Sequence, residues 1–192
     1  IVPKAVDEYL DFIEKGKKQN ELQKLMNPVW HVHNGEIPDE SHIMSFSMLL
    51  NLVETSNADS KVLLWKFVKK YKPNLVEKEF PIFDKLIEYA IKYYKDVIKL
   101  NKKYKTPNDD EKNALKSLIK ALDNCNDKMT PEDIQTKIFS VGKENGYQHN
   151  LRDWFKLIYE VVFGDENGPR IGFFISFFGV SEMQNLIKEK IK

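Results

Sequence analysis

The spacing of apolar residues along the chain is that of α-helices. Within residues 4–15, four apolar residues recur at intervals of three and four, which places them on one helical face. Residues 27–44 lack this spacing, contain two prolines and a glycine, and are expected to form an irregular loop. The periodic pattern predicts helices over residues 4–15, 20–26, 45–55, from Asp59 to about Tyr71, and over 80–104, the last being the longest.

In the second half of the chain, helix start and stop signals recur. Thr106-Pro107 and Thr130-Pro131 each place a capping hydroxyl before a proline, which is favoured in the first helical turn. Further helices are expected to start at Asn150, Gly168-Pro169 and Ser181, the last in a capping box with Gln184, and to end at Gly146, Gly164 and Gly179. No segment alternates cleanly between apolar and polar residues. We therefore predict an all-α fold of roughly eight to ten helices with essentially no sheet.

Composition narrows the class of protein. The apolar fraction of 42% over 192 residues suits one domain, residues 1–192, with a sub-boundary near 106–108, where the charge pattern changes. No apolar run is long enough to cross a membrane, and the single cysteine, Cys125, excludes an internal disulfide and a cysteine-based zinc site. We expect a cytoplasmic protein. Its first residue is not Met, which fits a piece of a longer chain.

A basic stretch is the first candidate for chemistry. Residues 61–105 contain thirteen lysines against five acidic residues, although the whole chain has a net charge of only +1. On an ideal helix, one face carries Lys85, Lys92, Lys95, Lys99 and Lys102, with Tyr89, Tyr93 and Tyr104 beside it. Such a row can neutralise phosphates and stack an unpaired base. The alternative is an ordinary solvated face of a lysine-rich protein.

Two arginines form the second candidate. Arg152 and Arg170 are the only arginines among 30 basic residues, and a planar guanidinium contacts carboxylates, phosphates and bases in ways that lysine cannot. Arg170 is expected in the first turn of a helix, where free N–H groups favour anions. It could bind a phosphate or a base edge, or instead pair with Asp165 or Glu166 in a tight loop.

A histidine pair is the third candidate. His31 and His33 could both reach a metal from an extended loop, with His42 the one further histidine close in sequence. A metal site needs three or four ligands, so we expect no metal here and interpret the segment as a structural or RNA-contacting loop. Glycine-rich phosphate loops, dinucleotide fingerprints and nucleophile elbows do not occur, and we expect no catalytic residue in this chain.

Several segments, in order along the chain, resemble the C-terminal part of class I lysyl-tRNA synthetase, the archaeal-type enzyme that some bacteria also use. The segments that carry the resemblance are Phe46–Leu52, Lys143–Gly146, Arg152–Phe155, Gly168–Gly172 and Gly179-Val180. Pro3–Tyr9 is similar to the stretch where that family's chain leaves its stem-contact region, and Trp30–His33 to a segment of the bacterial branch. The ordered set is far more specific than any single segment.

The resemblance implies a C-terminal helical domain of the α-helix cage type that binds the anticodon. The family's catalytic half is a Rossmann-type domain with His-Ile-Gly-His-like and Lys-Met-Ser-Lys-Ser-like signatures, and neither occurs here. The full enzyme acts in translation, joining lysine to its tRNA with ATP and magnesium, whereas this chain would contain no cofactor. Its implied partners are tRNA(Lys) and the N-terminal catalytic domain of the same enzyme.

From the residues and the resemblance together, one set of RNA-binding side chains is expected: Arg152, Arg170, Lys92, Lys95, Lys99, Lys102, Tyr89 and Tyr93. Two other functions remain open. A helical protein-interaction module would use the acidic stretch 107–133 as its surface, and a small helical hydrolase would use His31, His33 and His42.

Overall fold

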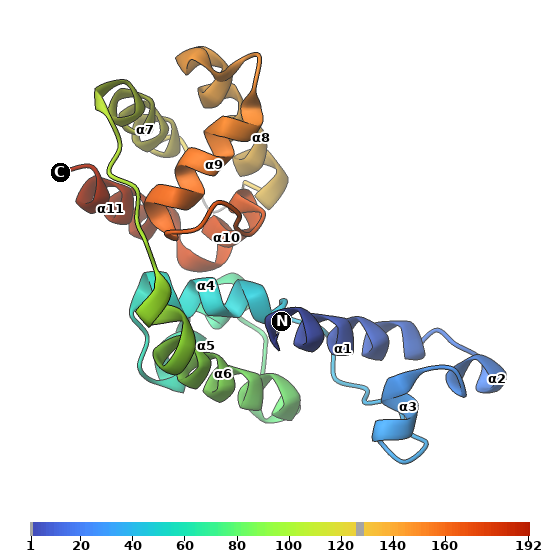
Figure 1. Cartoon of the computed structure of the whole chain (residues 1–192). Helices are drawn as coiled ribbons and strands as arrows, with labels where there is room; N and C mark the ends of the chain where they lie inside the picture. The colour runs from blue at the N-terminus through green and yellow to red at the C-terminus, as the bar shows by residue number, and fades with distance from the viewer. Residues whose placement is uncertain (1, 126–128) are drawn as a thin grey trace.

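The computed structural model describes residues 2–125 and 129–192, and every regular element in those two ranges is helical (Figure 1). The all-α prediction is confirmed. Within these ranges the α-helices are α1 (Val2–Gly16), α2 (Glu21–Lys24), α3 (Pro28–Val32), α4 (Phe46–Ser56), α5 (Lys61–Tyr71), α6 (Pro81–Tyr93), α7 (Asp109–Leu122), α8 (Pro131–Gly142), α9 (Leu151–Val162), α10 (Ile171–Phe178) and α11 (Val180–Lys190). These eleven helices exceed the predicted eight to ten because α3, a short helix, lies inside the expected loop 27–44.

Shorter helical turns complete the chain. A 3₁₀ turn, Glu77–Glu79, precedes α6, and a π-helical turn, Tyr94–Ile98, follows it. A second 3₁₀ turn, Lys99–Asn101, and a second π-helical turn, Lys143–Tyr147, come later. The expected single helix over 80–104 is therefore wrong in its second half: α6 ends at Tyr93 and the path changes before Lys102.

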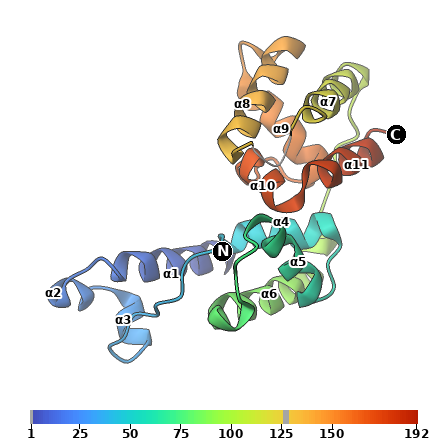
Figure 2. The same ribbon diagram turned by 180° about the vertical axis from the view of Figure 1, so that it is seen from behind.

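The helices form two groups and an arm. Both views show α4, α5 and α6 in one group and α7 to α11 in another, joined by an extended segment around residue 105, while α1 to α3 extend away to the side (Figures 1 and 2). Among residues 2–125 and 129–192, no helix has both the length and the apolar character that a membrane crossing requires.

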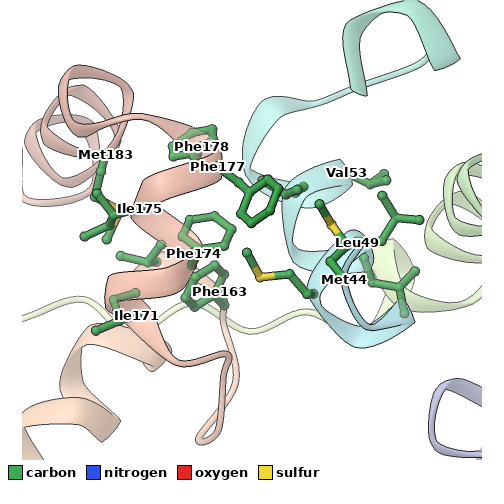
Figure 3. Close-up of a cluster of buried hydrophobic side chains, with 14 of the residues drawn as sticks. Met44, Leu49, Val53, Phe163, Ile171, Phe174, Ile175, Phe177, Phe178 and Met183 are labelled. Atoms are coloured by element: carbon green, nitrogen blue, oxygen red, sulfur yellow. The ribbon is translucent and has the colours of Figure 1, made fainter. Parts of the chain in front are cut away.

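Aromatic side chains of α10 join the two groups. Figure 3 shows Phe174 and Phe177 of α10 facing Met44 and Leu49 of the first group, and all four are almost completely buried. The Phe177 ring also packs 4.2 Å, centroid to centroid, from that of Tyr71 on α5. Because α10 is covered on nearly all sides, its run of apolar residues needs no exposed face.

Gly172 allows α10 to lie directly against α8. A Cβ atom at this position would come within 2.2 Å of the Pro131 carbonyl oxygen, so a larger residue would separate the two helices. The Gly172 N–H donates to Oε1 of Gln135 on α8 over 2.8 Å. This side-chain acceptor satisfies one of the free N–H groups at the start of α10.

The capping residue predicted from the sequence is the observed one at some helices and not at others. Thr130 caps α8, as expected, and it forms a capping box with Asp133. At α7 the expected Thr106 cap is wrong: Asn108 is the cap, and it forms the box with Glu111. The helix predicted to start at Asp59, with this residue as its cap, instead has Ser60 at the cap position of α5.

The start of the last helix and the expected loop over residues 27–44 also differ from the prediction. The expected Ser181–Gln184 capping box is wrong, because the Gln184 amide makes contacts with α7 instead. It donates to the carbonyl oxygen of Ile119, in α7, and to the carboxylate of Asp123, the C-terminal cap of α7. Residues 27–44 are not wholly irregular. Asn27 accepts a hydrogen bond from the Val29 N–H and begins α3 with Pro28 in its first turn.

A buried ion pair lies where the two groups meet. The Glu54 side chain on α4 is only 3% exposed, and its Oε2 lies 3.0 Å from Nζ of Lys102, itself 14% exposed. The Tyr104 hydroxyl donates to the other Glu54 oxygen over 2.7 Å, and Lys102 also donates to the Phe163 carbonyl oxygen at the end of α9. The carboxylate thus connects α4, the extended segment and α9.

Burial and the neighbouring Glu54 carboxylate both raise the pKa of Tyr104 well above its usual 10.0. The ammonium of Lys190, on α11, lies over the Tyr104 ring at 3.3 Å from its centroid. Burial lowers the pKa of Lys190, an effect that Glu54 and Glu189 partly offset. The hydroxyl of Tyr104 is therefore protonated and donating throughout the neutral range.

Replacing Phe177 by Ala should destabilise the protein by about 3–5 kcal/mol, because it opens a cavity between the two helix groups. Urea unfolding followed by circular dichroism measures the change. Phe139→Ala is the matched control: Phe139 is 37% exposed, so its truncation should cost less than about 2 kcal/mol. Equal losses for the two variants would contradict the packing described for α10.

Tyr104→Phe should lower stability at neutral pH by about 1–3 kcal/mol, since a hydrogen bond to a buried carboxylate is lost. The variant should also lose less stability under alkaline conditions. A folded-state pKa raised above 10.0 means that this hydroxyl's contribution is complete below pH 10 and is lost as the pH rises beyond it. Lys190 acts in the opposite direction but is present in both proteins. Urea midpoints from pH 7 to 11 test this, and parallel curves for the two proteins would contradict it.

Candidate nucleic-acid interface

Three of the side chains expected to bind RNA line one groove. Tyr89, Lys92 and Tyr93 of α6 border a space of about 310 Å³ between α6 and α1, whose other walls are mainly apolar and include Val6 and Phe46. The Tyr89 ring is 59% exposed, whereas Tyr93 is partly buried and packs against Phe46 with 6.5 Å between ring centroids. The groove thus offers one exposed and one supported aromatic ring, with an ammonium at its edge.

Helical spacing explains why these three residues meet. Tyr89, Lys92 and Tyr93 are three and four positions apart within the regular part of α6, so they share one face. The opposite face, which includes Ile87 and Ala90, is buried in the first group of helices. The sequence pattern therefore predicted that these three side chains share one face of the helix.

The rest of the lysine row is only partly continuous with the groove. Lys85, Lys92, Lys95 and Lys99 are exposed, and none of them forms an ion pair with a residue in the described ranges. The Lys99 N–H donates five residues back, to the Tyr94 carbonyl oxygen, which marks the π-helical turn. The extra residue in that turn rotates the chain that follows it.

Lys102 does not belong to the exposed row, and its expected place on that face is wrong. Beyond the π-helical turn its ammonium points to Glu54 and to the Phe163 carbonyl oxygen instead of solvent. Tyr104, expected beside the row, likewise directs its hydroxyl to Glu54. Neither contact is visible in the local sequence, because Glu54 is on a different helix.

Arg170 occupies the cap position of α10 and is well exposed. Its guanidinium lies 3.5 Å from Glu132 of α8, and this pair is open to solvent on both sides. The alternative pairing with Asp165 or Glu166 is not found. Glu166 instead pairs with Lys156 over 2.8 Å, and Asp165 accepts a hydrogen bond from the Asn167 N–H. An exposed pair of this kind is weak and easily exchanged for another anion.

The start of α10 is less open to an anion than expected, because Gln135 already accepts from the Gly172 N–H. Arg152 is exposed in the first turn of α9. Hydrogen bonding from Lys156, and to a smaller extent the charge of Arg152, lowers the pKa of Glu166. The two arginines therefore offer exposed guanidinium groups on the second helix group.

The histidine segment is tied into the arm. Nε2 of His33 lies 2.8 Å from the Tyr9 hydroxyl, and the two rings are stacked. Nε2 of His31 lies 2.7 Å from the Leu25 carbonyl oxygen. In the part of the chain that the structure describes, no group of three or more His, Cys, Asp or Glu side chains has an arrangement that could hold a metal. These contacts give the histidines a structural role in joining α3 to α1 and α2.

A second groove was not anticipated from the sequence. It has a volume of about 540 Å³ and lies between α4, the turns that follow α6 and the loop before α10. Asn51, Asn101 and Asn167 all border it. Asn51 lies inside Phe46–Leu52 and Asn167 directly precedes Gly168–Gly172, two segments that carried the family resemblance, and this is the one signal that pointed to this place.

Comparison with curated proteins supplies a relationship that covers the whole chain. It is 38% identical over 193 aligned positions to a protein of Rickettsia peacockii (strain Rustic) named lysine–tRNA ligase. It is 37% identical to the lysine–tRNA ligase of Rickettsia bellii (strain OSU 85-389), and 38% identical to that of Rickettsia africae (strain ESF-5). In each case the alignment covers 100% of this chain and 37% of the relative.

Two other comparisons found no relationship: no family model matches the chain, and no solved structure matches it. The relationship to the curated proteins therefore stands on sequence similarity that extends from one end of the chain to the other. Over its whole length, this chain is similar to a region of proteins named lysine–tRNA ligase, and it spans little more than a third of their length.

Proposed function

We propose that this chain is the anticodon-binding region of a class I lysyl-tRNA synthetase. The observation that carries the proposal is its end-to-end similarity to about a third of several lysine–tRNA ligases. The helical fold and the lack of ATP-binding signatures in the sequence support a non-catalytic part of such an enzyme. The full-length protein would attach lysine to its tRNA in the cytoplasm with ATP and magnesium, which its catalytic domain would bind.

The groove between α1 and α6 supports this function chemically. Single-stranded RNA loops expose unpaired bases, which stack on aromatic rings, while lysines attract the phosphates between them. Tyr89 is the exposed ring, and Lys92 and Lys95 are exposed cations on the same element or the turn after it. Phosphate contacts would position the RNA and base contacts would specify it.

The catalytic domain of the same protein is the second proposed partner. The tip of the arm exposes several large apolar side chains, which are typical of a protein contact. They are Leu22, Leu25, Met26 and Val32. The same apolar tip would also suit the alternative function, a helical protein-interaction module. The interacting surface would then be the tip of the arm and not the expected acidic stretch 107–133, of which residues 126–128 lie outside the described residues.

Salt dependence separates RNA binding from a protein-interaction function. The double variant Lys92→Ala, Lys95→Ala should weaken binding of lysine tRNA and of a noncognate tRNA by the same factor, because phosphate contacts carry no sequence information. It should also flatten the dependence of log Kd on log salt by about 0.7 for each lost contact to single-stranded RNA. Fluorescence anisotropy at several salt concentrations measures both effects.

Lys116→Ala, Lys120→Ala is the control for that experiment. It removes two exposed lysines that lie four positions apart on α7, a helix of the other group that does not border the groove. The control should bind both tRNAs as the unmodified protein does. If both double variants lose the same affinity, the attraction is due to net charge alone and the groove is not the binding site.

Arg170→Lys should separate a base-reading arginine from a structural one. The substitution keeps the charge but removes the planar fork, and should cost about 1–3 kcal/mol of binding for lysine tRNA and much less for a tRNA with a different anticodon. Glu132→Gln, which removes the ion-pair partner of Arg170 but leaves its guanidinium, should retain discrimination. Unchanged discrimination by a folded Arg170→Lys protein would show that Arg170 does not read a base.

A further inference from the structure

The second groove, between the two helix groups, has walls suited to a flat, partly polar ligand. Its volume of about 540 Å³ falls within the range of about 300–1,000 Å³ common for small-ligand pockets. Met48, Ile98 and Pro169 provide apolar surfaces on different sides. An aromatic heterocycle could place its faces against such surfaces while its edge reaches polar groups.

One cation with spare hydrogen-bonding capacity borders this groove. The ammonium of Lys102 has three N–H donors. One is directed to the Phe163 carbonyl oxygen and another to the Glu54 carboxylate, and no further acceptor in the described ranges is bonded to it. Because Glu54 neutralises its charge, Lys102 is suited to donate to a neutral carbonyl oxygen more than to capture a phosphate.

Amide side chains provide the complementary acceptors. The Asn51 NH₂ group donates to the Ser47 carbonyl oxygen over 2.8 Å, and the Asn101 NH₂ group to the Val97 carbonyl oxygen over 2.9 Å. Each bond orients its amide and leaves the Oδ1 atom as a free acceptor in the described ranges. A carboxylate, Asp165, also borders the groove and would repel a phosphate there.

We propose that this groove binds one unstacked RNA base by its Watson–Crick edge, and that it prefers uracil or guanine to cytosine or adenine. Uracil and guanine present a carbonyl oxygen beside a ring N–H, which matches the Lys102 donor and an asparagine acceptor. Cytosine and adenine present an amino donor beside an unprotonated ring nitrogen, which reverses both positions. This inference rests on the proposed function and adds a base preference to it.

Two short RNAs test the preference in the protein. Heptauridylate and heptacytidylate have the same charge and ring size but opposite base edges. Fluorescence anisotropy should show heptauridylate binding roughly tenfold more tightly, the order of magnitude of one paired base-edge contact. Asn51→Ala, Asn101→Ala should bring the two affinities to within about twofold and leave heptacytidylate binding unchanged.

Three variants make each outcome decisive. Asn185→Ala, an exposed asparagine of α11 away from the groove, should retain the preference. Lys92→Ala, Lys95→Ala should weaken both RNAs and keep their ratio. If the double asparagine variant does not fold, Asn101→Ala, at an exposed position in the turn Lys99–Asn101, replaces it and should reduce the preference.

Failure of this inference differs from failure of the proposed function. Equal binding of the two RNAs, weakened by the lysine variant, would overturn the base preference and support RNA binding. A preference that survives the asparagine variants, or one that Asn185→Ala also abolishes, would overturn the groove as its origin. No binding of either RNA would overturn both proposals.

Discussion

The Glu54 carboxylate lies in a place that solvent barely reaches, and a charge in such a place is stable only with close partners. Those partners come from outside its own helix: the ammonium of Lys102 and the hydroxyl of Tyr104. Satisfying this one carboxylate therefore determines how the chain leaves α6 and crosses to α7. The aromatic face of α10 can then pack on α4, and both grooves acquire the walls described above.

The sequence predicted the helices well wherever the deciding contacts are local. The period of apolar residues is a property of a single helix, and the capping box of Thr130 with Asp133 spans four residues. Tyr89, Lys92 and Tyr93 meet on one face for the same reason. In the candidate interface, these are the residues whose mutual placement was predictable.

Contacts between distant segments explain the differences. Lys102 was assigned to an exposed row because an ideal helix was extended through a π-helical turn, and its partner Glu54 could not be known from the residues around it. Gln184 resembles the last member of a capping box, yet its amide bonds to Ile119, which lies 65 positions earlier. The groove with Asn51 and Asn167 could not be assembled from any single segment, since different parts of the chain supply its walls.

The π-helical turn at Tyr94–Ile98 also limits how the chain can change over evolution. A regular α-helix advances about 100° per residue, so deleting one residue from this turn would restore ordinary helical bonding but rotate Lys102 by about that angle, away from Glu54. An added residue would have a similar effect. An exposed side chain of this turn, such as Val97, can be exchanged without rotating Lys102. Related chains should therefore vary in the composition of this turn while keeping its length, and an insertion or deletion here would need a compensating change on α4.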